Sequence, residues 1–431
     1  MRKKDSEIYV CSNCGNEHSK WSGKCLSCGN WGTLKELKIS DSVSRGNVEK
    51  AKPIDINKVS LKISGRIKTN IDELDLVLGG GIVPGSVLLL GGKPGIGKST
   101  LAWQIVCNIS GKVVYVAGEE SVEQIKIRAQ RIGKIPKNII FFENPDLLTW
   151  LDYLKKERPR VVIIDSIQTT YRSDLPNSPG SIVQVKESAV EIIRVAKSYN
   201  IACILIGHVT KDGEVAGPRT LEHLVDGVFY LEGEDGMSER FLKSHKNRFG
   251  PTDELGVFMM TGEGMVSYLD FGRVTKVKKL PPGVARVALL EGSRVYFIEV
   301  QSLVQKSNFG FPKRTAVNYD LNRLQMIIAI LGRHTDVDLG AFDVYLNIAE
   351  GYKLKNPVSD LAVLMSLASS FYNRELPGDH IFLGEVDLSA RLHLPVTAKK
   401  IVKSVQKLKL KSIYQSEKGL RQIIAEYFKE N

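Results

Sequence analysis

Residues 86–101 constrain the fold most, because they read SVLLLGGKPGIGKSTL and match the pattern G-x-x-x-x-G-K-[ST] from Gly92 to Ser99. Glycines in this pattern let backbone N–H groups point inward around a phosphate, at the positive end of the following helix. Lys98 then reaches the β and γ phosphates, and the Ser99 hydroxyl binds Mg²⁺. A glycine-rich turn without a ligand is the alternative. The flanking apolar strand and helix favour nucleoside triphosphate binding.

The residues predicted to hold ATP and Mg²⁺ belong to this loop and to the end of a later strand. The loop contributes Gly92, Lys93, Pro94, Gly95, Ile96, Gly97, Lys98, Ser99 and Thr100. Asp165 closes the apolar run VVIID, and ligands of open α/β sheets lie at the carboxyl ends of strands. We therefore predict that Asp165 and Ser99 bind Mg²⁺. The alternative is that Asp165 caps the next helix.

Two further strand ends carry candidate catalytic groups. Glu119 and Glu120 follow an apolar run, and a carboxylate within hydrogen-bond reach can polarise the attacking water. Glu119 is the preferred candidate, although both acids could instead offset the dipole of the next helix. His208 follows the apolar run 201–206 and is predicted to sense the γ-phosphate, with a purely structural histidine as the alternative.

The amino-terminal cysteines predict a zinc site. Four of the six cysteines form two Cys-x2-Cys knuckles, which are Cys11, Cys14, Cys25 and Cys28. Paired knuckles are typical of tetrahedral Zn²⁺, and so small a segment needs the metal to fold. Disulfides are the disfavoured alternative because nothing in the sequence indicates export. Trp21 and Trp31 are expected to pack beside the metal, with contact to a partner as the alternative.

Length and charge narrow the class of protein. A chain of 431 residues is expected to hold two or three domains. Its longest apolar runs are only as long as a strand, and the amino terminus lacks the apolar segment of a signal peptide. We therefore expect a cytoplasmic protein that does not bind a membrane. The net charge of +12 favours a polyanionic partner, by default a nucleic acid. A merely solvated basic surface is the alternative.

Beyond the loop, apolar strand-like runs alternate with helical patterns, as in a mostly parallel α/β sheet covered by helices on both faces. Strands are predicted at 113–117, 139–142, 161–165 and 201–206, and helices at 71–78, 98–110, 121–132, 147–156 and 181–199. Short runs at 228–231, 240–244, 256–260 and 266–268 predict antiparallel additions. Ser121 and Gln124 have the spacing of a capping box. The polar stretch 38–58 lacks apolar periodicity and predicts a linker.

Four motifs together resemble the RadA (Sms) family of bacterial recombination and repair ATPases. They are the cysteine knuckle with KWSGKC, the loop GGKPGIGKST, AGEES at 117–121 and KNRFG at 246–250. The resemblance covers nearly the whole chain. It implies a RecA-like ATPase core related to hexameric helicases, with a Lon-protease-like domain behind it. It also implies single-stranded and branched DNA, a homo-hexameric ring, and the RecA recombinase and other repair proteins as partners.

The resemblance also gives Lys246 and Arg248 a catalytic role. KNRFGPT is similar to the segment with which ring helicases of the DnaB type reach the nucleotide of the neighbouring subunit. Two cations delivered across a subunit interface would stabilise charge that develops on the γ-phosphate. Phe249 departs from that helicase pattern, which has a polar residue there. The alternative is a basic turn that binds the phosphate backbone of DNA.

From about Lys279 onward the sequence resembles the proteolytic domain of Lon but departs from it where catalysis would occur. Val358 stands where Lon carries its nucleophilic serine, and Lys400 falls near its partner lysine. Ser359 is one residue out of register, which on a helix turns it about 100° from the site. A lysine without a nucleophile cannot run acyl transfer. We therefore expect a structural, ring-forming and DNA-binding domain, with six lysines and no acid in 397–412.

These observations predict a zinc finger at 1–37, a linker at 38–58, a RecA-like ATPase domain at 59–275 and a Lon-protease-like α+β domain at 276–431. The predicted function is a DNA-dependent, helicase-like ATPase ring that promotes branch migration at recombination intermediates. Two alternatives remain: an ATP-dependent protease of Lon type, and a module that uses ATP only to switch its affinity for DNA or protein.

Overall fold

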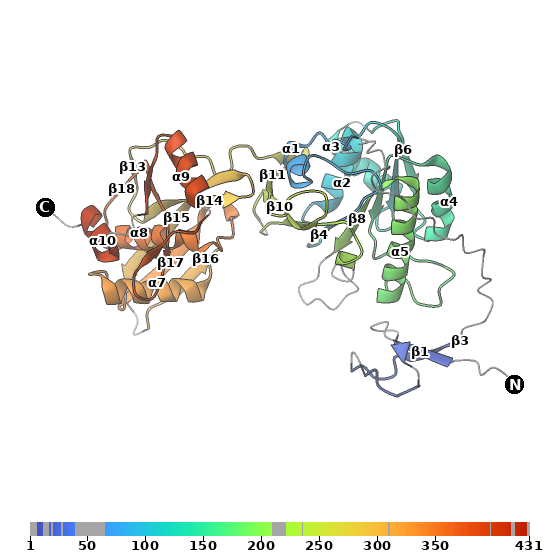
Figure 1. The fold of residues 1–431 in the computed structure, drawn as a ribbon, viewed down its shortest axis with the longest axis horizontal. Helices are drawn as coiled ribbons and strands as arrows, with labels where there is room; N and C mark the ends of the chain where they lie inside the picture. The colour runs from blue at the N-terminus through green and yellow to red at the C-terminus, as the bar shows by residue number, and fades with distance from the viewer. Residues whose placement is uncertain are drawn as a thin grey trace, which may run out of the picture. The chain divides into compact units, whose positions relative to one another are not determined.

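The computed structural model describes residues 7–11, 17–18, 20–26, 29–38, 65–133, 135–208, 221–234, 236–308, 311–396, 398–414 and 419–428. The chain divides into two compact units, Met1–Glu232 with Arg240–Ser267 and Gly233–Glu239 with Tyr268–Asn431 (Figure 1). The predicted linker lies outside the described residues except for Lys38, which ends strand β3 (Leu34–Lys38). The domain boundaries predicted from the sequence remain predictions.

A large sheet with the order β12-β11-β10-β9-β4-β8-β7-β5-β6 organises the first unit. Its parallel part comprises β4 (Val87–Gly92), β5 (Val113–Ala117), β6 (Ile139–Phe142), β7 (Val161–Asp165), β8 (Ala202–His208) and β9 (Gly227–Glu232). Strand β10 (Glu239–Asn247) runs antiparallel to β9, and β11 (Leu255–Thr261) runs antiparallel to β12 (Gly264–Ser267). The predicted parallel sheet with antiparallel additions is therefore confirmed.

Helices cover both faces of this sheet. Helices α1 (Asp72–Val77), α2 (Lys98–Asn108) and α3 (Val122–Ile132) pack on one face, and α4 (Leu147–Glu157) and α5 (Ile182–Tyr199) pack on the other. Successive side chains of a strand point to opposite faces, so Leu88 and Leu90 join the first core and Leu89 the second. Burial on both faces explains the continuous apolar runs. The capping box of Ser121 and Gln124 begins α3 as predicted.

The amino-terminal segment forms a small separate sheet. Strand β1 (Glu7–Cys11) pairs antiparallel with β2 (Glu17–His18) and with β3. In the described part of this segment, the buried side chains are Cys11, Cys25 and Leu34, with Tyr9 packed against them. Such a small core cannot stabilise a fold by apolar burial alone.

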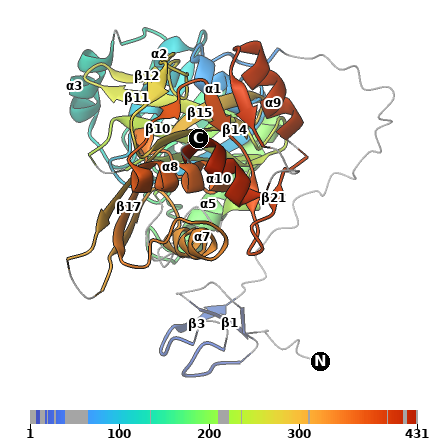
Figure 2. The same cartoon turned by 90° about the vertical axis from the view of Figure 1, so that its left-hand side faces the viewer.

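The second unit is a separate α+β body. Strand β15 (Arg294–Lys306) pairs antiparallel with β14 (Val284–Glu291) and β17 (Phe342–Ile348), and β16 (Arg314–Val317) pairs parallel with β17. Helix α8 (Asp360–Tyr372) packs on β14 and β15, and α7 (Leu321–His334) packs on α8 (Figure 2). The remaining described elements are β13 (Lys279–Leu280), β18 (Leu376–Pro377), β19 (His380–Phe382), β20 (Glu385–Val386), β21 (Leu392–His393), α9 (Ala398–Lys407), β22 (Lys411–Ile413) and α10 (Leu420–Phe428).

Ser359 lies at a helix start, as the sequence comparison with Lon assumes, but in a short 3-10 helix. It ends the 3-10 helix Pro357–Ser359, and α8 begins at Asp360. The Ser359 side chain is buried, and its hydroxyl donates to the Asn356 carbonyl at 2.8 Å. Lys400 lies on α9 and is exposed. Of the described helices, none is long and apolar enough to cross a membrane.

Candidate nucleotide site at the carboxyl ends of the parallel strands

The phosphate loop connects the end of β4 to the start of α2, and close packing fixes its shape. Gly97 has a φ of +112°, and a Cβ there would lie 2.3 Å from Cε of Met265. A Cβ at Gly92 would lie 2.6 Å from the carbonyl oxygen of Leu231. Only glycine fits positions with such contacts and such a φ. The loop therefore has the backbone form that the sequence pattern requires.

One part of the loop is buried in the protein and another part is exposed to solvent. Ile96 is buried, and its carbonyl accepts a hydrogen bond from Nε of Arg240 at 3.1 Å. The outer residues Lys93, Pro94 and Gly95 are exposed, and Ser99 and Thr100 lie half-buried in the first turn of α2. This arrangement leaves a helix amino terminus and an exposed glycine-rich turn together, which fits a phosphate group.

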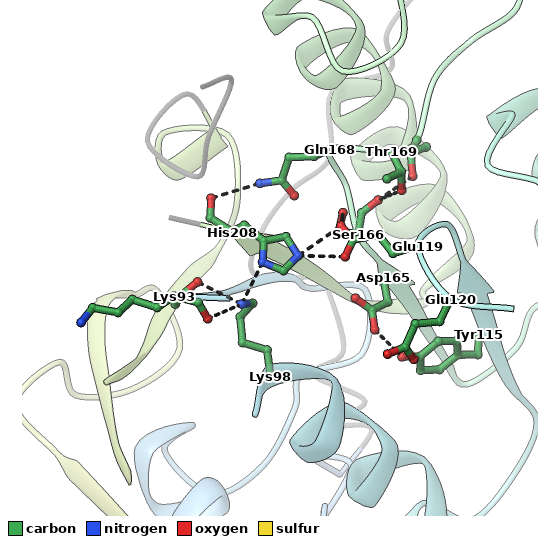
Figure 3. Close-up of polar contacts among 12 residues, drawn as sticks. Lys93, Lys98, Tyr115, Glu119, Glu120, Asp165, Ser166, Gln168, Thr169 and His208 are labelled. Carbon is green, nitrogen blue, oxygen red and sulfur yellow. Dashed lines mark hydrogen bonds and ion pairs between the residues drawn. The ribbon is translucent and has the colours of Figure 1, made fainter. Parts of the chain in front are cut away.

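Lys98 folds back over the loop (Figure 3). Its Nζ donates to the carbonyls of Gly92 at 2.9 Å and Lys93 at 2.8 Å, and lies 3.1 Å from Nδ1 of His208. The residue is only 3% exposed. Burial lowers the pKa of Lys98 to about 8, although the nearby carboxylates of Asp165 and Glu119 partly oppose this shift.

Three parallel strands bring Glu119, Asp165 and His208 to the same edge of the sheet. The backbone N–H of Gly118 donates to the Asp165 carbonyl at 2.7 Å, which joins the ends of β5 and β7. Nε2 of His208 lies 3.1 Å from both carboxylate oxygens of Glu119 (Figure 3). The hydrogen bond from His208, helped by one from the Ser166 hydroxyl, lowers the pKa of Glu119. Lys98, His208 and Glu119 thus form one connected polar chain.

Glu120 and Glu119 have different surroundings although they are neighbours in the sequence. Glu120 forms an ion pair with Arg128 of α3, with 2.6 Å between Oε2 and the guanidinium. Glu119 faces His208 and the phosphate loop instead. The structure therefore separates a carboxylate beside the loop from one that holds the next helix.

Asp165 is buried and has a fixed orientation. The Tyr115 hydroxyl donates to Oδ2 of Asp165 at 2.6 Å, and burial raises the pKa of Tyr115 well above its usual range. Asp165 also lies close enough to raise the pKa of Lys98. The carboxylate of Asp165 and the hydroxyl of Ser99 are hard oxygen donors of the kind that Mg²⁺ prefers. These residues fit the ion that the motif implies.

Lys246 and Arg248 lie at the opposite edge of the same sheet. Nζ of Lys246 donates to the carbonyls of Glu222 at 2.8 Å and His223 at 3.3 Å. A guanidinium nitrogen of Arg248 lies 3.4 Å from one oxygen of Asp226. The other Asp226 oxygen accepts the backbone N–H of Val87, the first residue of β4. Burial and the nearby Arg248 charge lower the pKa of Lys246.

Several residues of the site were not expected from the sequence. They are Tyr115, Ser166, Gln168, Asp226 and Arg240, of which Gln168 donates to the His208 carbonyl at 3.2 Å. Ser166 directly follows Asp165, so its place after a strand was a usable signal. Tyr115 and Asp226 carry no sequence signal, because their partners come from distant elements.

The structure describes two of the four cysteines predicted to bind zinc. Cys11 and Cys25 are buried: Sγ of Cys11 lies 3.2 Å from the Thr33 hydroxyl, and Sγ of Cys25 lies 3.3 Å from Nε2 of His18. Cys14 and Cys28 lie outside the described residues, within which no group of three or more His, Cys, Asp or Glu side chains is placed to hold a metal. Buried thiols in a segment with so small a core fit Zn²⁺.

The expected packing of Trp21 and Trp31 beside the metal is wrong. The two residues are 64% and 75% exposed, and the buried space beside Cys11 and Cys25 is taken by Leu34 and Tyr9.

Comparisons with known proteins match nearly the whole chain. A family model described as an AAA domain matches residues 52–214, and one described as a rubredoxin metal binding domain matches residues 9–36. The DNA repair protein RadA of Campylobacter jejuni is 41% identical, over 97% of this chain and 96% of its own. RadA of Brucella abortus is 43% identical, over 93% and 89%, and RadA of Rickettsia bellii is 42% identical, over 96% and 94%.

Among solved structures, the RadB recombinase matches 47% of this chain and 99% of its own, at 26% identity and a TM-score of 0.38. The match to the AAA domain indicates an ATPase, and the second family model confirms the amino-terminal metal-binding ribbon. Because relatives above 40% identity span more than nine-tenths of this sequence, the chain belongs to the RadA family of DNA repair proteins.

Proposed function

We propose that the protein is a DNA-dependent ATPase that assembles as a homo-hexameric ring and promotes branch migration at recombination intermediates. Family membership, the AAA domain and the basic composition support this proposal. Single-stranded and branched DNA are the proposed nucleic-acid partners, and RecA and other repair proteins are proposed protein partners.

The proposed chemistry uses groups that the sheet gathers beside the phosphate loop. Lys98 binds the β and γ phosphates of ATP, and Glu119 orients the attacking water. Ser99 and Asp165 would hold Mg²⁺, which when bound neutralises phosphate charge. His208 contacts both Lys98 and Glu119. A shift of Lys98 when the γ-phosphate binds or leaves would therefore move His208 and, with it, the carboxylate that positions the water.

One observation carries the proposal of a ring: the two halves of the catalytic machinery lie at opposite ends of β4. The phosphate loop starts at Gly92, whereas Arg248 is tied through Asp226 to Val87. Six residues of strand separate these ends by about 17 Å. Arg248 therefore cannot reach the loop of its own subunit. We propose that Lys246 and Arg248 act on the nucleotide of a neighbouring subunit, where they stabilise charge on the γ-phosphate.

The second unit is proposed to be a structural, DNA-binding domain of Lon-like fold. A protease function has no support at Val358 and Ser359, because Val358 has no nucleophile and the Ser359 hydroxyl is buried against the Asn356 carbonyl. The sequence predicts an apolar helix face of Ile401, Val402, Val405 and Leu408, and helix α9 buries Ile401 and Val405 and exposes lysines. Val402 is only half-buried, and Leu408 follows the end of α9 and is exposed. A helix with this charge distribution suits phosphate backbones.

The amino-terminal ribbon is proposed to bind Zn²⁺ through Cys11, Cys14, Cys25 and Cys28. The metal, when bound, supplies the cross-link that holds the ribbon together. Cys11 and Cys25 are both buried in the same small core.

The direct test is the ATPase rate with and without single-stranded DNA, over a range of protein concentrations. A DNA-dependent ring motor should be stimulated by DNA and should lose activity per subunit on dilution. An ATP-switched binding module would show the same low rate in both conditions. Electron microscopy with ADP and single-stranded DNA should show rings with DNA through the centre, and monomers alone would contradict the proposal.

A further inference from the structure

The amino-terminal ribbon exposes two tryptophan side chains, whereas the other two tryptophans of the chain are buried. Trp21 is 64% exposed and Trp31 is 75% exposed, whereas Trp103 and Trp150 in the ATPase core are 1% and 0% exposed. Tryptophan is highly buried on average, so two strongly exposed tryptophans within eleven residues are a marked exception. Exposed aromatic residues on a folded element indicate an interaction surface.

The backbone holds Trp31 in a fixed place. Trp31 pairs with Lys24 in an antiparallel bridge, and the N–H of Gly32 donates to the Gly23 carbonyl at 2.8 Å. The N–H of Cys25 donates to the Asn30 carbonyl at 2.9 Å across the same hairpin. A Cβ built at Gly23 would lie 3.5 Å from the Trp31 ring, so one part of the ring packs against that glycine. The hairpin backbone therefore fixes the position of Trp31.

The ribbon that carries these rings also exposes lysines. Lys20, Lys24 and Lys35 are exposed, and Nζ of Lys24 lies 5.8 Å from the centre of the Trp31 ring. Between Cys11 and Lys35 the only acid is Glu17, whereas Glu7 and Glu36 lie in strands β1 and β3. Aromatic faces with neighbouring lysines are the combination that binds single-stranded nucleic acid, because bases stack on the rings while lysines neutralise phosphates.

We propose that Trp21 and Trp31 form a stacking platform for bases of single-stranded DNA, with Lys20 and Lys24 on the phosphate backbone. The platform adds a second DNA contact to the DNA-dependent activity proposed above and depends on that activity for its biological role. A protein partner is the competing occupant. It would be expected to bury Leu26 as well, which lies in the same hairpin and is 84% exposed but has no aromatic face.

The first test uses the intrinsic fluorescence of the full-length, zinc-loaded protein titrated with single-stranded oligothymidylate. Stacking of a base on Trp21 or Trp31 should quench part of the emission. The double variant Trp21→Phe with Trp31→Phe should emit only from the buried Trp103 and Trp150, and DNA should leave that signal unchanged. Loss of the DNA response in the double variant supports the platform. An equal DNA response in both proteins, or none in either, overturns it.

The second test measures affinity for the same oligonucleotide by anisotropy. Trp21→Ala and Trp31→Ala should each weaken binding about fivefold or more, since stacking of a base on an aromatic ring contributes on the order of 1 kcal/mol. Leu26→Ala is the matched control in the same hairpin and should bind as the wild type does. Zinc content measured for each variant should stay stoichiometric, which shows that the ribbon is folded.

Two outcomes would contradict the stacking platform but leave the proposed DNA-dependent ATPase function intact. Trp21→Ala and Trp31→Ala that bind DNA as the wild type does, or a Leu26→Ala variant weakened as much as they are, would show that the surface does not stack bases. DNA stimulation of ATPase in those variants would then still stand. Failure of DNA to stimulate the wild type would instead contradict the proposed function itself.

Discussion

Nζ of Lys98 lies 3.1 Å from Nδ1 of His208, and Nε2 of the same ring lies 3.1 Å from each carboxylate oxygen of Glu119. One imidazole therefore joins the ammonium group of Lys98, beside the phosphate loop, to the carboxylate proposed to position water. A change at either end of this chain can be transmitted to the other through the histidine.

Replacing His208 should separate catalysis from binding. His208→Ala removes the link but leaves the phosphate loop intact, so kcat should fall about tenfold or more while the KM for ATP changes little. Steady-state kinetics with a direct nucleotide-binding measurement would check this. His208→Gln, which keeps a donor and an acceptor, should retain more activity than the alanine variant. A raised KM with unchanged kcat would show that His208 only binds substrate.

The two adjacent glutamates should respond differently to neutralisation. Glu119→Gln should lower kcat by about a hundredfold or more with ATP affinity retained, because it removes the carboxylate beside the loop. Glu120→Gln is the matched control, since Glu120 pairs with Arg128 of α3. It should cost some stability of α3 but little activity. Single-turnover hydrolysis would measure both, and the reverse order of effects would assign the water to Glu120.

Nucleotide binding should take up protons in mildly alkaline solution. Burial lowers the pKa of Lys98 to about 8, and the phosphates of bound ATP raise it again. Proton uptake should therefore grow and affinity should fall as the pH rises from ~7 to ~9. In the absence of nucleotide the unfolded chain, with the ordinary lysine pKa of 10.5, binds more protons above pH 8. The free energy of unfolding of the nucleotide-free protein should therefore rise between about pH 8 and pH 10.5.

Calorimetry in buffers of different ionisation enthalpy would measure this uptake. Lys98→Ala should show none in any nucleotide binding that remains. Wild-type binding with no proton uptake at any pH in this range would contradict the lowered pKa of Lys98.

Loss of one cysteine should unfold the ribbon alone. Cys25→Ser should release zinc, because metal binding and folding are one equilibrium in so small a site. The ATPase core should melt at the wild-type temperature, which the emission of the buried Trp103 and Trp150 would report. Cys107→Ser, in helix α2, is the matched control and should keep its zinc. Stoichiometric zinc in Cys25→Ser would exclude that cysteine as a ligand.

The sequence predicts the ATPase core well because its strands are buried on both faces. The runs 113–117, 139–142 and 161–165 are bounded by turn residues and appear as β5, β6 and β7 with the predicted limits. The run predicted at 201–206 continues to His208 in β8, because Gly207 and His208 keep pairing with Gly91 and Gly92. The apolar pattern ends at Ile206, so the sequence does not show that the strand continues through Gly207 and His208.

Side-chain partners were harder to predict than elements. The sequence places Glu119 and Glu120 side by side, and their partners distinguish them: Arg128 in the next helix binds Glu120, and His208 from the distant strand β8 binds Glu119. The expectation for Trp21 and Trp31 failed because it assumed a larger core, and the core of the described part of the ribbon consists of Cys11, Cys25 and Leu34 with Tyr9 packed against them.

The ring account depends on Arg248 acting on a neighbouring subunit, and a mixing experiment tests this most directly. Arg248→Ala has an intact phosphate loop without the arginine, and Lys98→Ala has the arginine without a working loop, so each alone should be inactive. In mixed rings about one interface in four joins a good loop to a good arginine. The ATPase rate should then rise well above the sum of the two proteins. If subunits exchange and the rate stays at that sum, Arg248 does not act in trans.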